Sequence, residues 1–149
     1  MVRHEVKHKA QNKKYNCGPT SLAMLLDFYN IPHVEDDLEA LCETSPKYGT
    51  NHDGIVKAAT SLGAKVVEKE QASIADIEKA LKAGHPVLVN YFNPLTHVGH
   101  FAIIKGIDGQ SVIFADPKNG DNFRLTFEAF ENNWHNHNKT LLRWMMHLA

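Results

Sequence analysis

The fold of the first half of this chain is decided by Asn16-Cys17-Gly18-Pro19-Thr20-Ser21-Leu22-Ala23-Met24-Leu25-Leu26-Asp27-Phe28-Tyr29. The apolar residues of this stretch are nearly continuous, as in a helix that is buried on most sides. Proline is tolerated in a first helical turn, and Asn30 with Ile31-Pro32 ends the segment. The sequence therefore predicts a buried helix with Cys17 at or just before its N-terminus.

Outward from this helix, the first half continues in helical segments and the second half changes to strands. The further predicted helices are Val34 to Cys42, Asp53 to Leu62, and a segment from a Ser73–Asp76 capping box to Ala83. The predicted strands are 87–92, 100–107, 111–115, a weaker one at 123–126, and a closing strand at 141–146, with a short helix at 127–130. We therefore predict an α+β fold in two layers, with N-terminal helices packed on a C-terminal antiparallel sheet.

Size and composition favour one globular domain over residues 1–149. The chain has 43% hydrophobic and 22% charged residues, and it shows no repeat, low-complexity tract or long linker. Its net charge of -1 does not favour a nucleic acid partner, and no apolar run reaches the roughly 20 residues of a membrane span. The basic start, Met1 to Lys9, lacks the apolar region of a secretory signal. We expect a cytoplasmic protein, either whole or as one domain of a longer polypeptide.

The two cysteines stand in different contexts. Cys42 follows Leu38-Glu39-Ala40-Leu41, where it fits a small apolar position on a helix. Cys17 lies at a helix start, where unpaired N–H groups and the positive end of the dipole stabilise a thiolate. An imidazolium stabilises it further, and His100, which begins a strong strand directly after Gly99, is the best candidate. The sequence predicts two free thiols, with Cys17 as a nucleophile and His100 as its general base.

A general-base histidine needs a group that fixes its tautomer and orientation. Asp116 fits this role, because Pro117 ends its strand at the edge of the sheet where His100 begins the preceding strand. We therefore predict Asp116 as the residue that orients His100.

The connection between these two strands offers a test of that pair. A two-residue turn at Asp108-Gly109 places Asp116 on the other face of the sheet from His100. Adding Gln110 to the loop instead places Asp116 opposite Ala102, one diagonal from His100, at roughly 7–8 Å between Cα atoms. The predicted pair therefore requires a bulged or odd-numbered connection.

Acyl transfer through a thiolate also needs hydrogen-bond donors for the oxyanion of its tetrahedral intermediate. The backbone N–H of Cys17 is one candidate. The side-chain amide of Gln11, six residues upstream, is another. We therefore add Gln11 to the predicted catalytic group.

A zinc site is the competing interpretation of the histidines. His97-Val98-Gly99-His100 supplies two possible ligands, but a third and fourth at a recognisable spacing are missing. The sequence His135-Asn136-His137 fits a solvated loop, and Asn93 to His97 fits a wall of a substrate cleft. We therefore predict no metal and no cofactor.

Four pieces in this order resemble the peptidase C39 family and its C39-like relatives: Gln11, Tyr15 to Met24, Gly99 to Ile104, and Ile113 to Pro117. The resemblance runs to about Trp134 and so covers most of the chain. It implies a papain-like cysteine peptidase fold, with Cys17, His100 and Asp116 at the family's triad positions and Gln11 at its oxyanion glutamine.

The chain also departs from the transporter-linked members of that family. Many C39 domains precede a transporter and trim leader peptides after a double glycine. This sequence has no membrane segment and no phosphate-binding loop, and Asn16 stands where leader peptidases often carry aspartate. A stand-alone C39-like protein is the closer match, and these departures argue against double-glycine specificity.

The resulting hypothesis is cleavage of a peptide or isopeptide bond through a thioester on Cys17, with a peptide or protein as substrate. The same residues could transfer the acyl group to an amine, and the sequence does not separate the two outcomes. A non-catalytic module that holds a peptide in the cleft is the second hypothesis.

Overall fold

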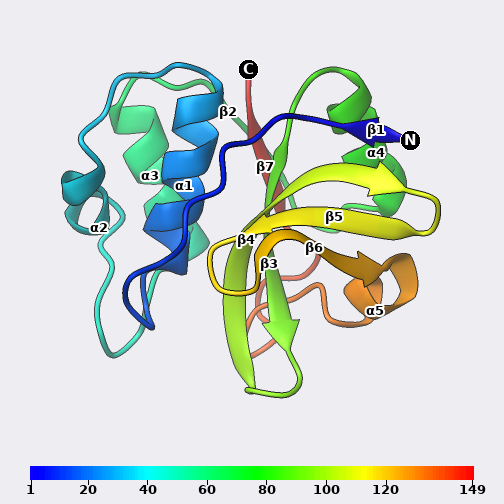
Figure 1. The fold of residues 1–149 in the computed structure, drawn as a ribbon. Helices are drawn as coiled ribbons and strands as arrows, with labels where there is room; N and C mark the ends of the chain where they lie inside the picture. Colours follow the sequence, from blue (N-terminus) through cyan, green and yellow to red (C-terminus); the bar gives the residue numbers. More distant parts are fainter.

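The computed structural model describes residues 1–149, in which a helical part and a sheet lie side by side (Figure 1). The helical part contains α1 (Cys17–Phe28), a 3-10 helix (Glu35–Asp37), α2 (Leu38–Leu41) and α3 (His52–Ser61). The helices predicted for the first half are thereby confirmed. No helix has the length and the apolar run that crossing a bilayer requires.

The sheet is antiparallel throughout and has seven strands. They are β1 (Val2–Arg3), β2 (Val66–Lys69), β3 (Val87–Asn93), β4 (Val98–Asp108), β5 (Ser111–Asp116), β6 (Gly120–Thr126) and β7 (Met145–Leu148). Their order is β2-β7-β3-β4-β5-β6, and β1 pairs with β4. The predicted α+β class is confirmed.

Both faces of the sheet are buried, because its central strands are apolar at almost every position. Leu88 and Ile103 pack with the buried residues of α1 and α3. Val89 and Ala102 belong to a second apolar cluster, which includes residues of α4 (Ile74–Lys82) and α5 (Phe127–Asn132). The two layers predicted from the sequence are therefore joined by a third, which α4 and α5 form on the far face of the sheet.

Local signals located α4 correctly. The Ser73 hydroxyl accepts a hydrogen bond from the Asp76 N–H at 3.2 Å, and the Asp76 carboxylate accepts one from the Ser73 N–H at 2.8 Å. This is the reciprocal capping box that the sequence predicts.

The edges of the sheet were predicted less well. The closing strand begins at Met145 instead of Leu141, because Arg143 has a φ of 49° and interrupts the extended backbone. Strands β1 and β2 were not predicted. Val66 to Lys69 form a mostly exposed edge strand, so no alternation of apolar and polar residues marks it.

Candidate active site

Cys17 is the first residue of α1 and is partly exposed. The first N–H groups of a helix have no partner within the helix, and the Asn16 side chain does not cap them. The Asn16 amide instead donates hydrogen bonds to Asn12 and Glu39. Free N–H groups and the positive end of the helix dipole therefore lie beside Cys17.

Cys42 has the opposite environment. Only 1% of its surface is exposed, and burial raises the pKa of its thiol to about 12. Neither cysteine is in a disulfide. At neutral pH, Cys42 is therefore a protonated core residue, as the sequence predicts.

His100 and Asp116 form a short hydrogen bond inside the protein. His100 Nε2 donates to Asp116 Oδ1 at 2.6 Å, and the Asp116 side chain has no exposed surface. Burial opposes the charge on Asp116, but the hydrogen bond and the charge of His100 outweigh it and lower the pKa of Asp116 to about 2. Burial likewise disfavours the imidazolium, yet hydrogen bonds to Asp116 and Cys17 raise the pKa of His100 to about 9.

Cys17 acts on the same imidazole, because interactions with its side chain help to raise the pKa of His100. Asp116 occupies Nε2 of the imidazole, so Nδ1 is the ring nitrogen left for the sulfur. Helix α1 lies beside β4, and β4 pairs with β5 (Figure 1). The structure therefore brings together three of the four residues predicted from the sequence, each from a different element.

The β4–β5 turn does not follow either connection considered from the sequence. Asp108 pairs with Ser111, so the turn consists of Gly109 and Gln110. By itself, this turn would put Asp116 opposite Ile103, on the other face of the sheet from His100.

A β-bulge in β4 corrects that register. The pairing shifts between Ile104 and Gly106, which leaves Lys105 as the extra residue, and Ile103 then pairs with Ala115. Asp116 consequently shares a face with His100. The expected bulged connection is confirmed, but the bulge lies within the strand and not at the turn.

Two further side chains that bind Asp116 were not predicted. The Tyr91 hydroxyl donates to Oδ2 at 2.5 Å, and the Asn119 amide donates to the same oxygen at 3.2 Å. The N–H groups of Lys118 and Asn119 each donate to Oδ1 at 2.9 Å. An aspartate followed by Pro117 often accepts such N–H groups in a turn, so the sequence carried a signal for Asn119. Tyr91 has no local signal, because its contact depends on the pairing of β3 with β4.

Gln11 lies at the edge of this group. Its backbone N–H donates to the carbonyl oxygen of Pro117 at 2.9 Å, next to Asp116. Its side-chain nitrogen contacts the carbonyl oxygens of Lys13 and Lys14 at 2.8 and 3.4 Å, while its side-chain oxygen is buried without a partner. The amide donors of Gln11 therefore face its own loop.

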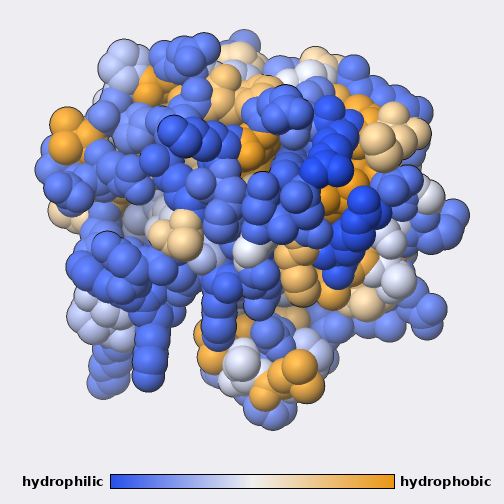
Figure 2. All heavy atoms as spheres, viewed as in Figure 1, coloured by the Kyte–Doolittle hydropathy of each residue, from blue (hydrophilic) through white to orange (hydrophobic).

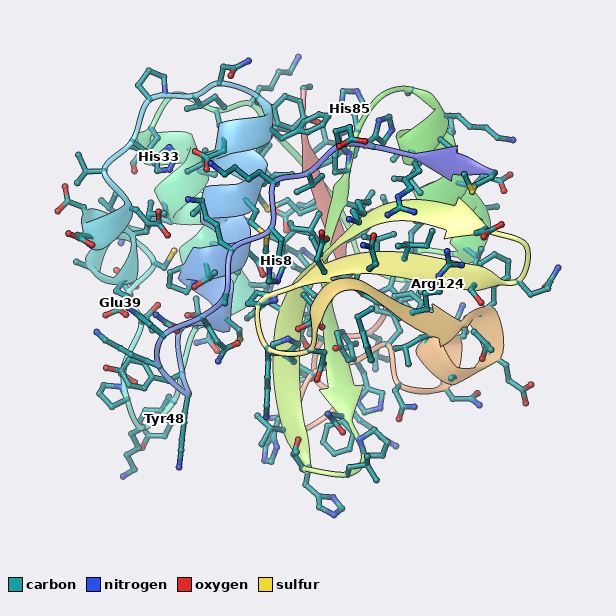
Figure 3. The ribbon with its side chains drawn as sticks, viewed as in Figure 1. His8, His33, Glu39, Tyr48, His85 and Arg124 are labelled. Atoms are coloured by element: carbon teal, nitrogen blue, oxygen red, sulfur yellow. The ribbon has the colours of Figure 1, made fainter.

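The N-terminal arm also ties the Asp116 turn to the rest of the molecule. His8 Nε2 bonds to the main-chain oxygen of Asp116 at 2.8 Å, which the sequence did not predict. Figure 3 shows His8 where the helical part meets the sheet. The arm thus crosses the junction between the two parts beside the end of β5.

A notch opens at the lower edge of the molecule as viewed in Figure 2, between the loop before α1 and the β3–β4 hairpin. The hairpin carries Leu95 and Val98, which are 90% and 54% exposed. The interpretation of Asn93 to His97 as a cleft wall stays a prediction. No three histidine, cysteine, aspartate or glutamate side chains gather as a set of metal ligands.

Comparison with known proteins now identifies the family. The sequence model of the Peptidase_C39 like family matches residues 3–142. The chain belongs to this family. It is also 33% identical over 112 residues to an uncharacterized protein of Methanothermobacter thermautotrophicus, covering 74% of this chain and 70% of that protein.

Solved structures of C39 peptidase domains share the fold. The peptidase domain of Streptococcus ComA, a bifunctional ABC transporter, superimposes with a TM-score of 0.80 at 24% identity, over 97% of this chain and 98% of that one. A C39-like peptidase from Bacillus anthracis gives 0.79 at 20% identity, over 99% and 97%. A double glycine motif protease from an AMS/PCAT transporter, solved in complex with its leader peptide, gives 0.77 at 21% identity, over 99% and 93%. The papain-like fold of C39 domains, expected from the sequence, is confirmed.

The raised pKa of His100 predicts that this C39-like protein loses stability in mild alkali. The folded chain holds the imidazole proton up to pH about 9, whereas the unfolded chain releases it near the ordinary pKa of 6.5. The contribution to the free energy of unfolding is therefore complete below pH about 6.5 and lost as the pH rises to about 9. Urea unfolding followed by tryptophan fluorescence across this range measures it.

Two variants separate this effect from other titrations. His100→Gln should flatten the dependence, and His137→Gln, an exchange in an exposed loop, should leave it unchanged. An undiminished slope in His100→Gln would contradict the assigned pKa.

Proposed function

We propose that this chain is a cysteine peptidase that hydrolyses a peptide or isopeptide bond through a thioester on Cys17. The observation that carries the proposal is an imidazole that is bonded to a buried carboxylate and whose pKa also responds to a partly exposed thiol at a helix start. Such a thiolate–imidazolium pair supplies both a nucleophile and a proton donor at neutral pH.

In the first half of the reaction, the Cys17 thiolate attacks the carbonyl carbon and the carbonyl π electrons move to the oxygen. The His100 imidazolium then gives its proton to the leaving amine, the C–N bond breaks, and a thioester remains. Asp116 keeps the ring oriented and stabilises its positive charge throughout. In the second half, neutral His100 takes a proton from water, whose oxygen displaces the sulfur and releases the acid.

The oxyanion of each intermediate needs donors. Cys17 is the first residue of α1, so its backbone N–H has no acceptor within the helix and is free for this role. Gln11 can serve as the second donor once its amide turns from Lys13 and Lys14 towards the thiol.

The substrate that we propose is a peptide or a protein. The related double glycine motif protease binds a leader peptide, which supports a peptide in the corresponding cleft of this chain. A primary amine in place of water would convert the same thioester into a new amide, so acyl transfer shares every step up to the thioester. Two free cysteines fit the reducing cytoplasm, where we expect this protein to work.

Alkylation at pH 7 tests the thiolate directly. With iodoacetamide and mass-spectrometric reading of both cysteine peptides, we expect Cys17 to react at least about tenfold faster than the same residue in His100→Gln. Cys42 should stay unmodified in both proteins because it is buried. Equal rates for Cys17 with and without the imidazole would overturn the proposal.

A further inference from the structure

Tyr91 is a buried aromatic residue next to His100, and the mechanism above gives it no role. It stands opposite His100 in the β3–β4 pairing, and only 3% of its surface is exposed. Its ring meets the His100 ring edge to face, with centroids 5.4 Å apart and planes at 89°. Phe114 packs on Tyr91 with the same centroid separation and so limits the movement of the Tyr91 ring itself.

The Tyr91 hydroxyl is part of a closed arrangement around one carboxylate oxygen. It donates to Asp116 Oδ2 at 2.5 Å and accepts from the Asn119 amide at 2.9 Å. Burial and the Asp116 charge raise the pKa of Tyr91, so the hydroxyl keeps its proton and remains a donor.

The two oxygens of the Asp116 carboxylate have different hydrogen-bond partners. Oδ1 faces His100 and the two N–H groups of the following turn, whereas Oδ2 is held by Tyr91 and Asn119. Charge-assisted hydrogen bonds to Oδ2 add to those on Oδ1 and restrict rotation of the carboxylate away from the imidazole. The orientation of His100 therefore depends on a hydroxyl that reaches the imidazole through the Asp116 carboxylate.

We propose that Tyr91, braced by Asn119, is a positioning residue that holds the Asp116 carboxylate against His100. This inference rests on the proposed function, because orientation of His100 matters only if the ring serves Cys17. The Tyr91 hydroxyl bonds to Asp116 and Asn119 and to neither His100 nor Cys17, so it acts on the imidazole through Asp116.

Tyr91→Phe keeps the ring and removes only the hydroxyl. We expect the NMR titration midpoint of His100 to fall from about 9 by about one pH unit, since a mobile carboxylate stabilises the imidazolium less. We also expect alkylation of Cys17 by iodoacetamide at pH 7 to slow by about tenfold. A residue with a purely structural role would lower the thermal midpoint without moving the His100 titration.

Tyr29→Phe is the matched control. Tyr29 is a half-buried tyrosine whose hydroxyl bonds to the His85 ring at 2.6 Å, so the exchange removes a comparable bond elsewhere. Asn119→Ala is the second variant. It removes the hydrogen bond from the Asn119 amide to the Tyr91 hydroxyl and should lower the His100 titration midpoint by a smaller amount. If Tyr91→Phe does not fold, Asn119→Ala decides.

The outcomes distinguish this inference from the proposed function. If Tyr91→Phe has the same His100 titration midpoint and the same Cys17 alkylation rate as Tyr29→Phe, the positioning role is overturned. The peptidase proposal stands in that case, provided that Cys17 of the wild-type protein reacts at the expected rate. A wild-type Cys17 that reacts no faster than in His100→Gln overturns the peptidase proposal itself.

Discussion

Replacing Cys17 by alanine is expected to lower peptide hydrolysis by about 10⁴-fold or more, because no other group can form the thioester. Alanine is well tolerated in a helix, so α1 should remain folded and keep its N–H groups in place. The measurement is kcat/KM for the best peptide found by profiling a peptide library with the purified chain. Trapping with a primary amine in the same assay shows whether the thioester is transferred or hydrolysed.

Cys42→Ala is the control for loss of a thiol. Cys42 packs among the buried residues under α1 and α3, so this exchange should reduce stability and leave turnover per folded molecule unchanged. A Cys17→Ala protein that retains every biochemical effect of the parent would instead identify a non-catalytic peptide-binding module.

Asp116→Asn is expected to produce the second largest loss, about 10²–10⁴ in kcat. The substitution preserves the shape of the side chain and removes the charge that raises the pKa of His100. The Asp116 carboxylate accepts five hydrogen bonds through its two oxygens. The amide of asparagine can accept only through its one oxygen, so it cannot replace all of them. The His100 titration midpoint should therefore fall from about 9 toward the ordinary value of 6.5, as NMR can measure.

Asp108→Asn makes the same chemical change at the other end of the hairpin. Asp108 pairs with Arg124 at the surface, where such an ion pair contributes little to stability. This variant should match the parent in turnover and in the His100 midpoint. An Asp116→Asn protein with full activity would rule out any orienting role for that carboxylate.

Features defined by neighbouring residues were predicted correctly. Cys17 begins α1 because the apolar run and the following Pro19 already define a helix start, and the capping box at Ser73 defined α4 in the same way. Local sequence also separated the two cysteines, since only Cys17 stands at a helix N-terminus, whereas Cys42 follows the last residue of α2. In each case the signal lies within a few residues of the feature.

Features that depend on distant pairing were predicted poorly. No sequence signal near Lys105 predicts the bulge there, although the register of Asp116 depends on it. An ion pair at 2.5 Å joins the buried Lys105 side chain to the exposed Asp121 on β6. Strand β1 passes so close to Gly106 that a Cβ there would lie 2.7 Å from the Val2 carbonyl oxygen. These contacts come from β6, which lies beyond β5, and from β1, which pairs with β4 and was not predicted at all.

The amino-acid sequence by itself determined the helix that carries Cys17, the strands that carry His100 and Asp116, and the family, because periodicity, caps and motifs are written in adjacent residues. Tertiary structure alone decided the one-residue shift that turns Asp116 to the same face as His100, and the placement of Tyr91 behind both. The physical reason is the two-residue period of a strand. A single extra residue reverses every side chain beyond it, and only contacts between strands can stabilise that residue.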